Sequence, residues 1–206
     1  MIYDVFPTPV YRSNLGQRIT QEQLDYCRKL ELIDNEKNKS SKNDNVLSSF
    51  YFKNILDFIG KEIWHFAHNV YGYDDSKVQF YITQSWVNIT KKNQAHHAHT
   101  HSNSIFSGVF YIKVEETDSI SFIRREKHYP FVNDIIIPKK DLTEDSEKYA
   151  GINFNCNIRE GDLLLFESML PHYYDPIETD ERISLSFNTF VKGELGHRDQ
   201  MTHLFL

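Results

Sequence analysis

The chain has 206 residues, of which 40% are apolar and 14% aromatic, and its formal net charge is −6 at pH 7. This composition excludes a disordered chain and suits one domain with a sizeable core. The acidic balance, without a basic stripe, argues against a nucleic-acid-binding protein. We see no secretory signal, no apolar run of the about 20 residues that a membrane span needs, and only two cysteines, Cys27 and Cys156. We therefore expect a protein of the reducing cytoplasm without membrane contact.

The first third of the chain carries helix signals. Thr20 and Gln23 have the spacing of a capping box, which predicts a short helix directly after them. Residues 33–47 are mostly polar, and this composition predicts a surface loop. Apolar residues then recur at intervals of three or four over 53–70, which predicts an amphipathic helix that Gly72 ends.

From residue 77 onward the sequence is typical of strands, because β-branched and aromatic residues dominate. A charged stretch at 133–150 predicts a second polar loop, which we expect to form a lid together with 33–47. Helices followed by many strands predict an α+β protein with a β-barrel or sandwich core. We expect one domain over 1–206, with 1–76 as mostly helical support and 77–206 as the β-barrel core. The predicted strands cover 78–89, 104–114, 120–123, 152–158, 162–166 and 183–191.

The most informative stretch is a short run rich in histidine. Side chains of a strand repeat every second residue, so His99 and His101 should lie on one face. By the same parity His97 should share that face and His96 should lie on the opposite one. His172 completes a candidate set of three imidazoles, which are common metal ligands. The competing interpretation is a solvated run of histidines that binds metal only adventitiously.

Several motifs together resemble the non-haem iron, 2-oxoglutarate-dependent oxygenases, in particular the type found in bacteria and in phages of marine cyanobacteria. The resemblance covers most of the chain. It implies a double-stranded β-helix, which is a jelly-roll or cupin-like barrel, with N-terminal helices packed on one side. The motifs are Val5–Tyr11, Ser85–Asn88, His99–His101, Ser107–Ile112, Gly161–Phe166, Leu170–His172 and Arg182–Asn188.

The resemblance also implies a role for each motif residue. His99, His101 and His172 would bind Fe(II), and the enzyme would use 2-oxoglutarate and O2. A guanidinium binds a carboxylate through two parallel hydrogen bonds, which suits the distal end of this dicarboxylate. The wider superfamily has a carboxylate ligand where this chain has His101, so the site is more positive by one charge. The residues that would bind 2-oxoglutarate are Arg182, Ser184, Tyr111 and Asn88.

The predicted function is a dioxygenase that hydroxylates a small molecule, an amino acid or a peptide. Two other interpretations stay open from the sequence. One is a cupin-type dioxygenase with three histidine ligands and no 2-oxoglutarate, and the other is a non-catalytic barrel that serves as a binding module. Taken alone, Arg182 would fit a surface salt bridge with Asp180 or Glu181. The acidic charge disfavours a nucleic-acid substrate, a homodimer is a candidate assembly, and a phage protein would act in the host cytoplasm.

Overall fold

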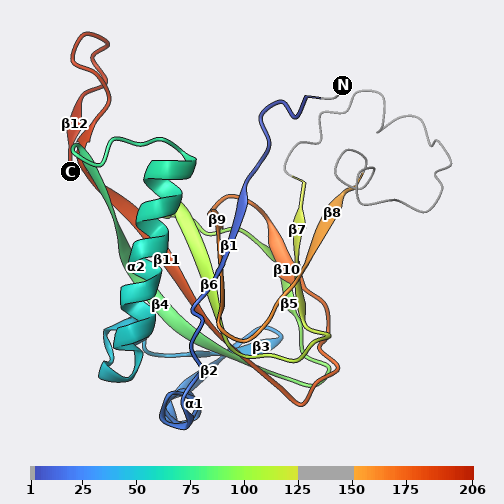
Figure 1. The fold of residues 1–206 in the computed structure, drawn as a ribbon. Helices are drawn as coiled ribbons and strands as arrows, with labels where there is room; N and C mark the ends of the chain where they lie inside the picture. Colours follow the sequence, from blue (N-terminus) through green and yellow to red (C-terminus); the bar gives the residue numbers. More distant parts are fainter. Residues whose placement is uncertain (1–2, 125–150) are drawn as a thin grey trace, which may run out of the picture.

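Two antiparallel sheets face each other in the computed structural model, which describes residues 3–124 and 151–206 (Figure 1). The larger sheet contains, in spatial order, β1 (Val10–Asn14), β9 (Asp162–Glu167), β6 (Phe106–Lys113), β11 (Glu181–Leu195), β4 (Val78–Lys91), β3 (Asn38–Ser41) and β2 (Leu32–Asn35), and β12 (Leu204–Phe205) pairs with β11. The smaller sheet contains β5 (His96–His99), β10 (His172–Tyr174), β7 (Ser119–Ile123) and β8 (Asn153–Asn157). From β4 to β7 and again from β8 to β11 the chain alternates between the two sheets, while β7 and β8 pair within the smaller one. This is the double-stranded β-helix that was expected.

The helices follow the sequence signals closely. Thr20 caps α1 (Gln21–Lys29), and the reciprocal bonds of its capping box with Gln23 are both present. The helix predicted over 53–70 is α2 (Lys53–His65) continued by one π-helical turn, η3 (Phe66–Val70), and Gly72 follows it with a φ of +72°. Two short 3₁₀ turns, η1 (Val46–Ser48) and η2 (Phe50–Phe52), lead into α2.

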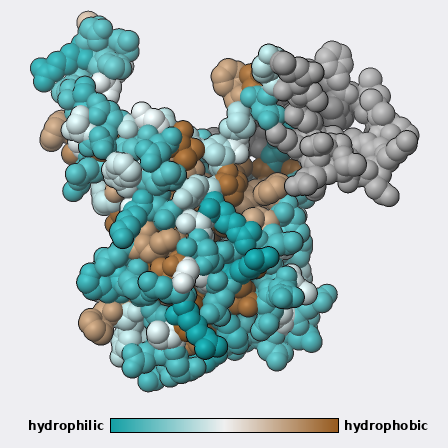
Figure 2. All heavy atoms as spheres, viewed as in Figure 1, coloured by the Kyte–Doolittle hydropathy of each residue, from teal (hydrophilic) through white to brown (hydrophobic). Residues whose placement is uncertain are grey.

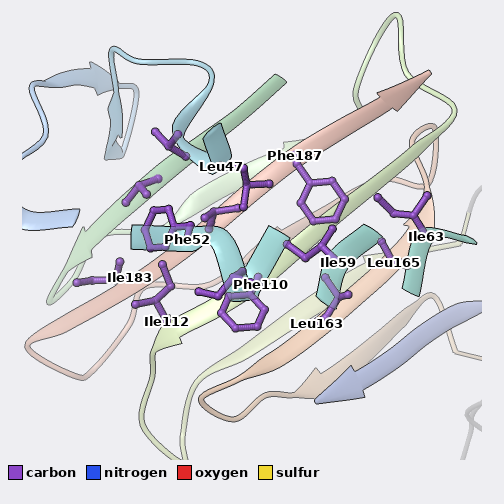
Figure 3. Close-up of a cluster of buried hydrophobic side chains, with 14 of the residues drawn as sticks. Leu47, Phe52, Ile59, Ile63, Phe110, Ile112, Leu163, Leu165, Ile183 and Phe187 are labelled. Carbon is purple, nitrogen blue, oxygen red and sulfur yellow. The ribbon is translucent and has the colours of Figure 1, made fainter. Parts of the chain in front are cut away.

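One face of α2 packs against the outer face of the larger sheet (Figures 1 and 3). Its buried stripe is Ile55, Ile59 and Ile63, and each fully buried isoleucine contributes about 1.5–3 kcal/mol to stability. Gly108 lets this layer close, because a Cβ there would lie only 2.2 Å from Cζ of Phe187. The sheet residues in this cluster include Phe110, Ile112, Leu163, Leu165, Ile183, Leu185 and Phe187.

The inner faces of the two sheets enclose a second core and a polar pocket. Strand alternation separates them: the odd positions of β11 from 183 to 187 are apolar and face α2, whereas even positions carry Arg182, Ser184 and Ser186 toward the inside. A cluster that includes Tyr111 and Phe166 fills the space beside that polar row. The sequence of β11 therefore determines both the helix-packing face and the wall of the pocket.

Residues 33–47 are not a loop, so that prediction was wrong. They form most of a β-hairpin, β2–β3, followed by η1, and β3 pairs with β4 in the larger sheet. The polar residues are buried because they have partners: Asn38 Nδ2 donates to Tyr174 Oη at 2.8 Å, and Ser40 Oγ donates to Asn88 Oδ1 at 2.7 Å. Residues 1–76 thus add strands to the sheet, which the expected helical support did not include. The loop expected at 133–150 lies outside the described residues.

Glu181, at the start of β11, is the centre of a charge cluster. Its carboxylate accepts hydrogen bonds from Arg28, Lys91 and Lys113. Burial would raise the pKa of this carboxyl, but the three basic partners outweigh burial and lower the pKa to about 2. The cluster ties α1, β4 and β6 to β11.

The outer surface is mostly hydrophilic on the face shown in Figure 2, where smaller apolar areas interrupt the polar side chains. In the described ranges, no helix combines the length and the apolar character needed to cross a bilayer.

Candidate metal centre

Three histidines, on β5, just after β5 and on β10, converge in one pocket between the sheets. His99 ends β5, and His172 begins β10 directly opposite it in the antiparallel register. His101 lies just beyond β5, where its backbone N–H donates to the carbonyl of Ser168 at 2.9 Å. The Nε2 atoms of His99 and His101 are 3.2 Å apart, and one nitrogen from each of the three rings lies within 4.8 Å of the others.

The opposite nitrogen of each ring is held by an oxygen. Nδ1 of His99 donates to the carbonyl of His97 at 2.8 Å, and Nδ1 of His172 donates to the carbonyl of Leu170 at 3.0 Å. Nδ1 of His101 donates to Oδ1 of Asn188 at 2.7 Å. Because these oxygens can only accept, each Nδ1 carries a proton and each Nε2 presents a lone pair to the centre.

This donor set fits a divalent metal ion. Two imidazole nitrogens bound at about 2.1 Å and at right angles to each other lie about 3.0 Å apart, close to the spacing of His99 and His101. Burial lowers the pKa of His101 to about 4 and of His172 to about 3, and it lowers the pKa of His99 as well. The rings are therefore neutral near pH 7, which is the form that binds metals.

Asn188 is a site residue that the sequence reasoning missed. It lies at a register shift in β11 and is buried, and its Oδ1 also accepts from Ser107 Oγ at 3.0 Å. The hydroxyl of Ser107 is also hydrogen-bonded to that of Ser168, which in turn donates to the hydroxyl of Ser104. The sequence did contain one signal for Asn188: it is an even number of residues from Arg182 on the same strand, so both side chains should face the pocket.

Arg182 is buried, so the interpretation as a surface salt bridge with Asp180 or Glu181 was wrong. Only 1% of it is exposed, and its guanidinium lies 4.1 Å from the ring centroid of Tyr174 and 5.3 Å from that of Tyr111. Nη1 donates to the carbonyl of Ser119 at 2.8 Å, while Nε has no partner. Within the described part of the chain, no carboxylate forms an ion pair with Arg182.

Tyr111 adds a second buried polar atom without a partner. Its ring is fully buried and its hydroxyl has no hydrogen bond, and burial raises the pKa of this hydroxyl above its usual value. Buried polar groups are rarely left unpaired. A buried cation and an unpaired hydroxyl in one pocket fit a small anion, and a dicarboxylate that reaches from the histidines to Arg182 meets both requirements.

The other expected co-substrate residues line the same pocket. Ser184 faces Tyr111 and Asn88 across its two neighbouring strands. Asn88 is already engaged, because its Nδ2 donates to Ser186 Oγ at 3.0 Å and its Oδ1 accepts from Ser40. The full lining is Trp86, Asn88, His96, His99, His101, Val109, Tyr111, Ile120, His172, Tyr173, Tyr174, Arg182, Ser184 and Ser186.

His96 also lines the pocket, which corrects the expected parity of the histidine run. His172 and Tyr174, two residues apart on β10, pair with His99 and His96, three residues apart on β5. This bulge turns both histidines to the same side. His97 is not among the residues that line the pocket, and its Nδ1 lies 2.9 Å from a carboxylate oxygen of Glu36. A bulge of one residue is not visible in the alternation of a sequence.

Comparison with known families decides the class of this protein. Residues 84–188, which include the three histidines and Arg182, match the family described as "Putative 2OG-Fe(II) oxygenase". The chain belongs to the 2-oxoglutarate- and Fe(II)-dependent oxygenases. It is thus an oxidoreductase of the class that uses Fe(II), 2-oxoglutarate and O2. The cupin-type alternative without 2-oxoglutarate is not favoured. The sequence matches no curated protein at a significant level.

Solved structures agree on the fold of this oxygenase. It resembles a prolyl-4-hydroxylase from Pseudomonas putida with 13% identity and a TM-score of 0.56, covering 88% of this chain and 92% of the other. HygX from Streptomyces hygroscopicus, solved with nickel and 2-oxoglutarate bound, has 11% sequence identity and a TM-score of 0.55. The match covers 88% of this chain and 82% of HygX. A 2OG-Fe(II) oxygenase family member from Burkholderia pseudomallei has 12% sequence identity and a TM-score of 0.54, and the match covers 82% of this chain and 76% of the other. At these identities the similarity establishes the double-stranded β-helix alone.

Proposed function

We propose that this oxygenase is a hydroxylase whose Fe(II) is bound by His99, His101 and His172 and whose 2-oxoglutarate is bound by Arg182. The observation that carries the proposal is the combination of three converging Nε2 lone pairs with a buried, carboxylate-free guanidinium in one pocket. Three histidines alone would fit many metal proteins, and a buried arginine alone would fit many anion sites. Together they match the two needs of the family's co-substrate, a metal at one end and a cation at the other.

Each pocket residue then has a defined task. Arg182 holds the distal carboxylate, and Tyr111 Oη and Ser184 Oγ supply further hydrogen bonds to the same end. Asn88 supports the pocket wall through Ser186 rather than offering a free amide. Burial between the sheets excludes water, which strengthens these charge-assisted hydrogen bonds.

The three neutral ligands change the charge balance of the centre. A ferrous ion keeps its full charge of +2 when all of its protein ligands are imidazoles, and the −2 charge of 2-oxoglutarate offsets it. Bound together, iron, 2-oxoglutarate and O2 supply the oxidising chemistry of the class. The protein contributes the positions of the ligands, the neutral state of the rings and the exclusion of water.

The proposed substrate is a small molecule, an amino acid or a peptide with an accessible C–H bond. The similar structures include a protein named as a prolyl-4-hydroxylase and a HygX structure with hygromycin B bound, which supports this range of substrates without selecting one. Residues 1–206 are proposed to act as one domain, because the strands of the first 76 residues belong to the sheet that carries Arg182.

The test is conversion of 2-oxoglutarate to succinate. Purified protein with Fe(II) and ascorbate is expected to form succinate slowly even without substrate, and Arg182→Ala is expected to abolish this at 2-oxoglutarate concentrations that saturate the unmodified protein. Lys192→Ala on the same strand serves as the matched control and should leave the rate unchanged. Absence of iron-dependent succinate would contradict the proposal and favour a dioxygenase without 2-oxoglutarate or a non-catalytic barrel. An unchanged rate with Arg182→Ala would contradict the role proposed for Arg182.

A further inference from the structure

His96 is a fourth imidazole in the pocket, and it has no place in the metal set. Its ring stacks on that of His99 with 4.3 Å between centroids and an angle of 26°. The group of nitrogens within 4.8 Å of one another contains His99, His101 and His172 but not His96. His96 therefore lies beside the candidate metal centre rather than in it.

His96 contacts His99 on one side and, on another, the ring of Tyr174 that also supports Arg182. Its ring meets the ring of Tyr174 edge-on, at 5.7 Å and 78°, and the guanidinium of Arg182 lies over that same ring at 4.1 Å. Tyr174 is itself anchored, because its hydroxyl binds both Asn38 and Thr90. His96 and Arg182 thus share one rigid aromatic support.

The ring nitrogens of His96 are available for a ligand. The other three pocket histidines each give Nδ1 to a protein oxygen, but no such bond to His96 occurs among residues 3–124 and 151–206. The β5 bulge, which interrupts the regular pairing with β10, directs this ring into the pocket. The guanidinium Nε of Arg182 is buried without a partner, and His96 lines the same pocket, which points to one anion that both would contact.

We propose that His96 is a co-substrate-contact residue, whose ring N–H donates a hydrogen bond to the distal carboxylate that Arg182 binds. This inference rests on the proposed binding of 2-oxoglutarate and adds a residue to it. It requires a dicarboxylate, because a 2-oxo acid without the distal carboxylate would reach the histidine cluster but leave His96 and Arg182 without an acceptor.

Calorimetric titration of the Ni(II)-loaded protein tests this, since nickel holds the co-substrate without turnover. His96→Leu is expected to raise the Kd of 2-oxoglutarate about 10- to 100-fold, the usual effect of losing a hydrogen bond to a charged group. It should leave the Kd of 2-oxovalerate, which lacks the distal carboxylate, unchanged. His96→Gln, which keeps a donor, should recover part of the loss. The control is Lys192→Ala, an exposed residue of β11 outside the pocket, and it should change neither Kd.

The outcomes separate this inference from the proposed function. If the unmodified protein binds nickel but not 2-oxoglutarate, the proposed function fails, and the role of His96 fails with it. If 2-oxoglutarate binds and His96→Leu behaves like Lys192→Ala, only the role of His96 is refuted. If His96→Leu weakens both acids equally, the residue acts by supporting the ring of His99, and the carboxylate contact is refuted. Thermal melting of each variant confirms that the fold is retained.

Discussion

Asn188→Ala should weaken metal binding without touching any metal ligand. The two strand-borne histidines are oriented by backbone carbonyls, which a mutation cannot remove, whereas His101 depends on the side chain of Asn188 at 2.7 Å. Removing such a partner usually lowers metal affinity by about 10- to 100-fold, or about 1.4–2.8 kcal/mol. The variant also leaves the hydroxyl of Ser107 without this acceptor, so we expect the metal-free protein to lose about 1–3 kcal/mol of stability.

The assay is calorimetric titration of the metal-free protein with Ni(II), together with thermal melting. Asn188→Asp keeps an oxygen acceptor and should retain an affinity close to that of the unmodified protein. Ser107→Ala removes the other donor to Oδ1 but leaves the bond to His101, so it should change stability more than metal affinity. The reasoning is refuted if folded Asn188→Ala binds nickel as tightly as the unmodified protein, or if Asn188→Asp binds as poorly as Asn188→Ala.

Three further predictions concern the co-substrate, acid stability and packing. Arg182→Lys should raise the Kd of 2-oxoglutarate at least about tenfold, because a lysine lacks the planar fork, while nickel affinity measured without 2-oxoglutarate stays the same. Glu181 has a pKa of about 2 in the folded protein, below the ordinary 4.5, so the stability it adds is complete above pH 4.5 and is lost as the pH falls toward 2. Glu181→Gln should therefore flatten acid unfolding curves in that window, at a cost of about 1 kcal/mol near pH 7 because solvent screens the cluster; an unchanged acid curve would argue against it. Gly108→Ala should destabilise the fold by at least about 1–3 kcal/mol in denaturant titrations, since its Cβ would overlap the buried ring of Phe187, and a neutral effect would mean that this layer can shift.

Much of the fold was readable from the sequence because local signals agreed with tertiary packing. The capping box at Thr20 gave the start of α1, and the stripe over 53–70 gave the bounds of α2 together with η3. The alternation of β11 identified one of the central strands, and the motif that holds Arg182 indicated its side of the sheet. In each of these elements, the apolar residues that repeat along the sequence are the ones that pack into the core.

The errors occur where polar residues are buried or a strand is irregular. The hairpin β2–β3 is polar in composition, but Asn38 and Ser40 are buried because they find partners on distant strands. His96 faces the pocket because of a bulge that depends on how β5 pairs with β10. Asn188 can orient His101 only because the fold brings β11 beside that histidine. Such features depend on which segments meet in space, and a single sequence does not contain that information.

The central claim is that one ion held by three imidazoles and one guanidinium bind the two ends of the same dicarboxylate. Anaerobic addition of 2-oxoglutarate to the Fe(II) protein tests it most directly, because chelation produces a weak visible charge-transfer band. We expect the band in the unmodified protein, its loss in His172→Ala, and its appearance only at higher 2-oxoglutarate concentrations in Arg182→Gln. No band in the iron-loaded protein, or a titration that Arg182→Gln does not shift, would contradict the account.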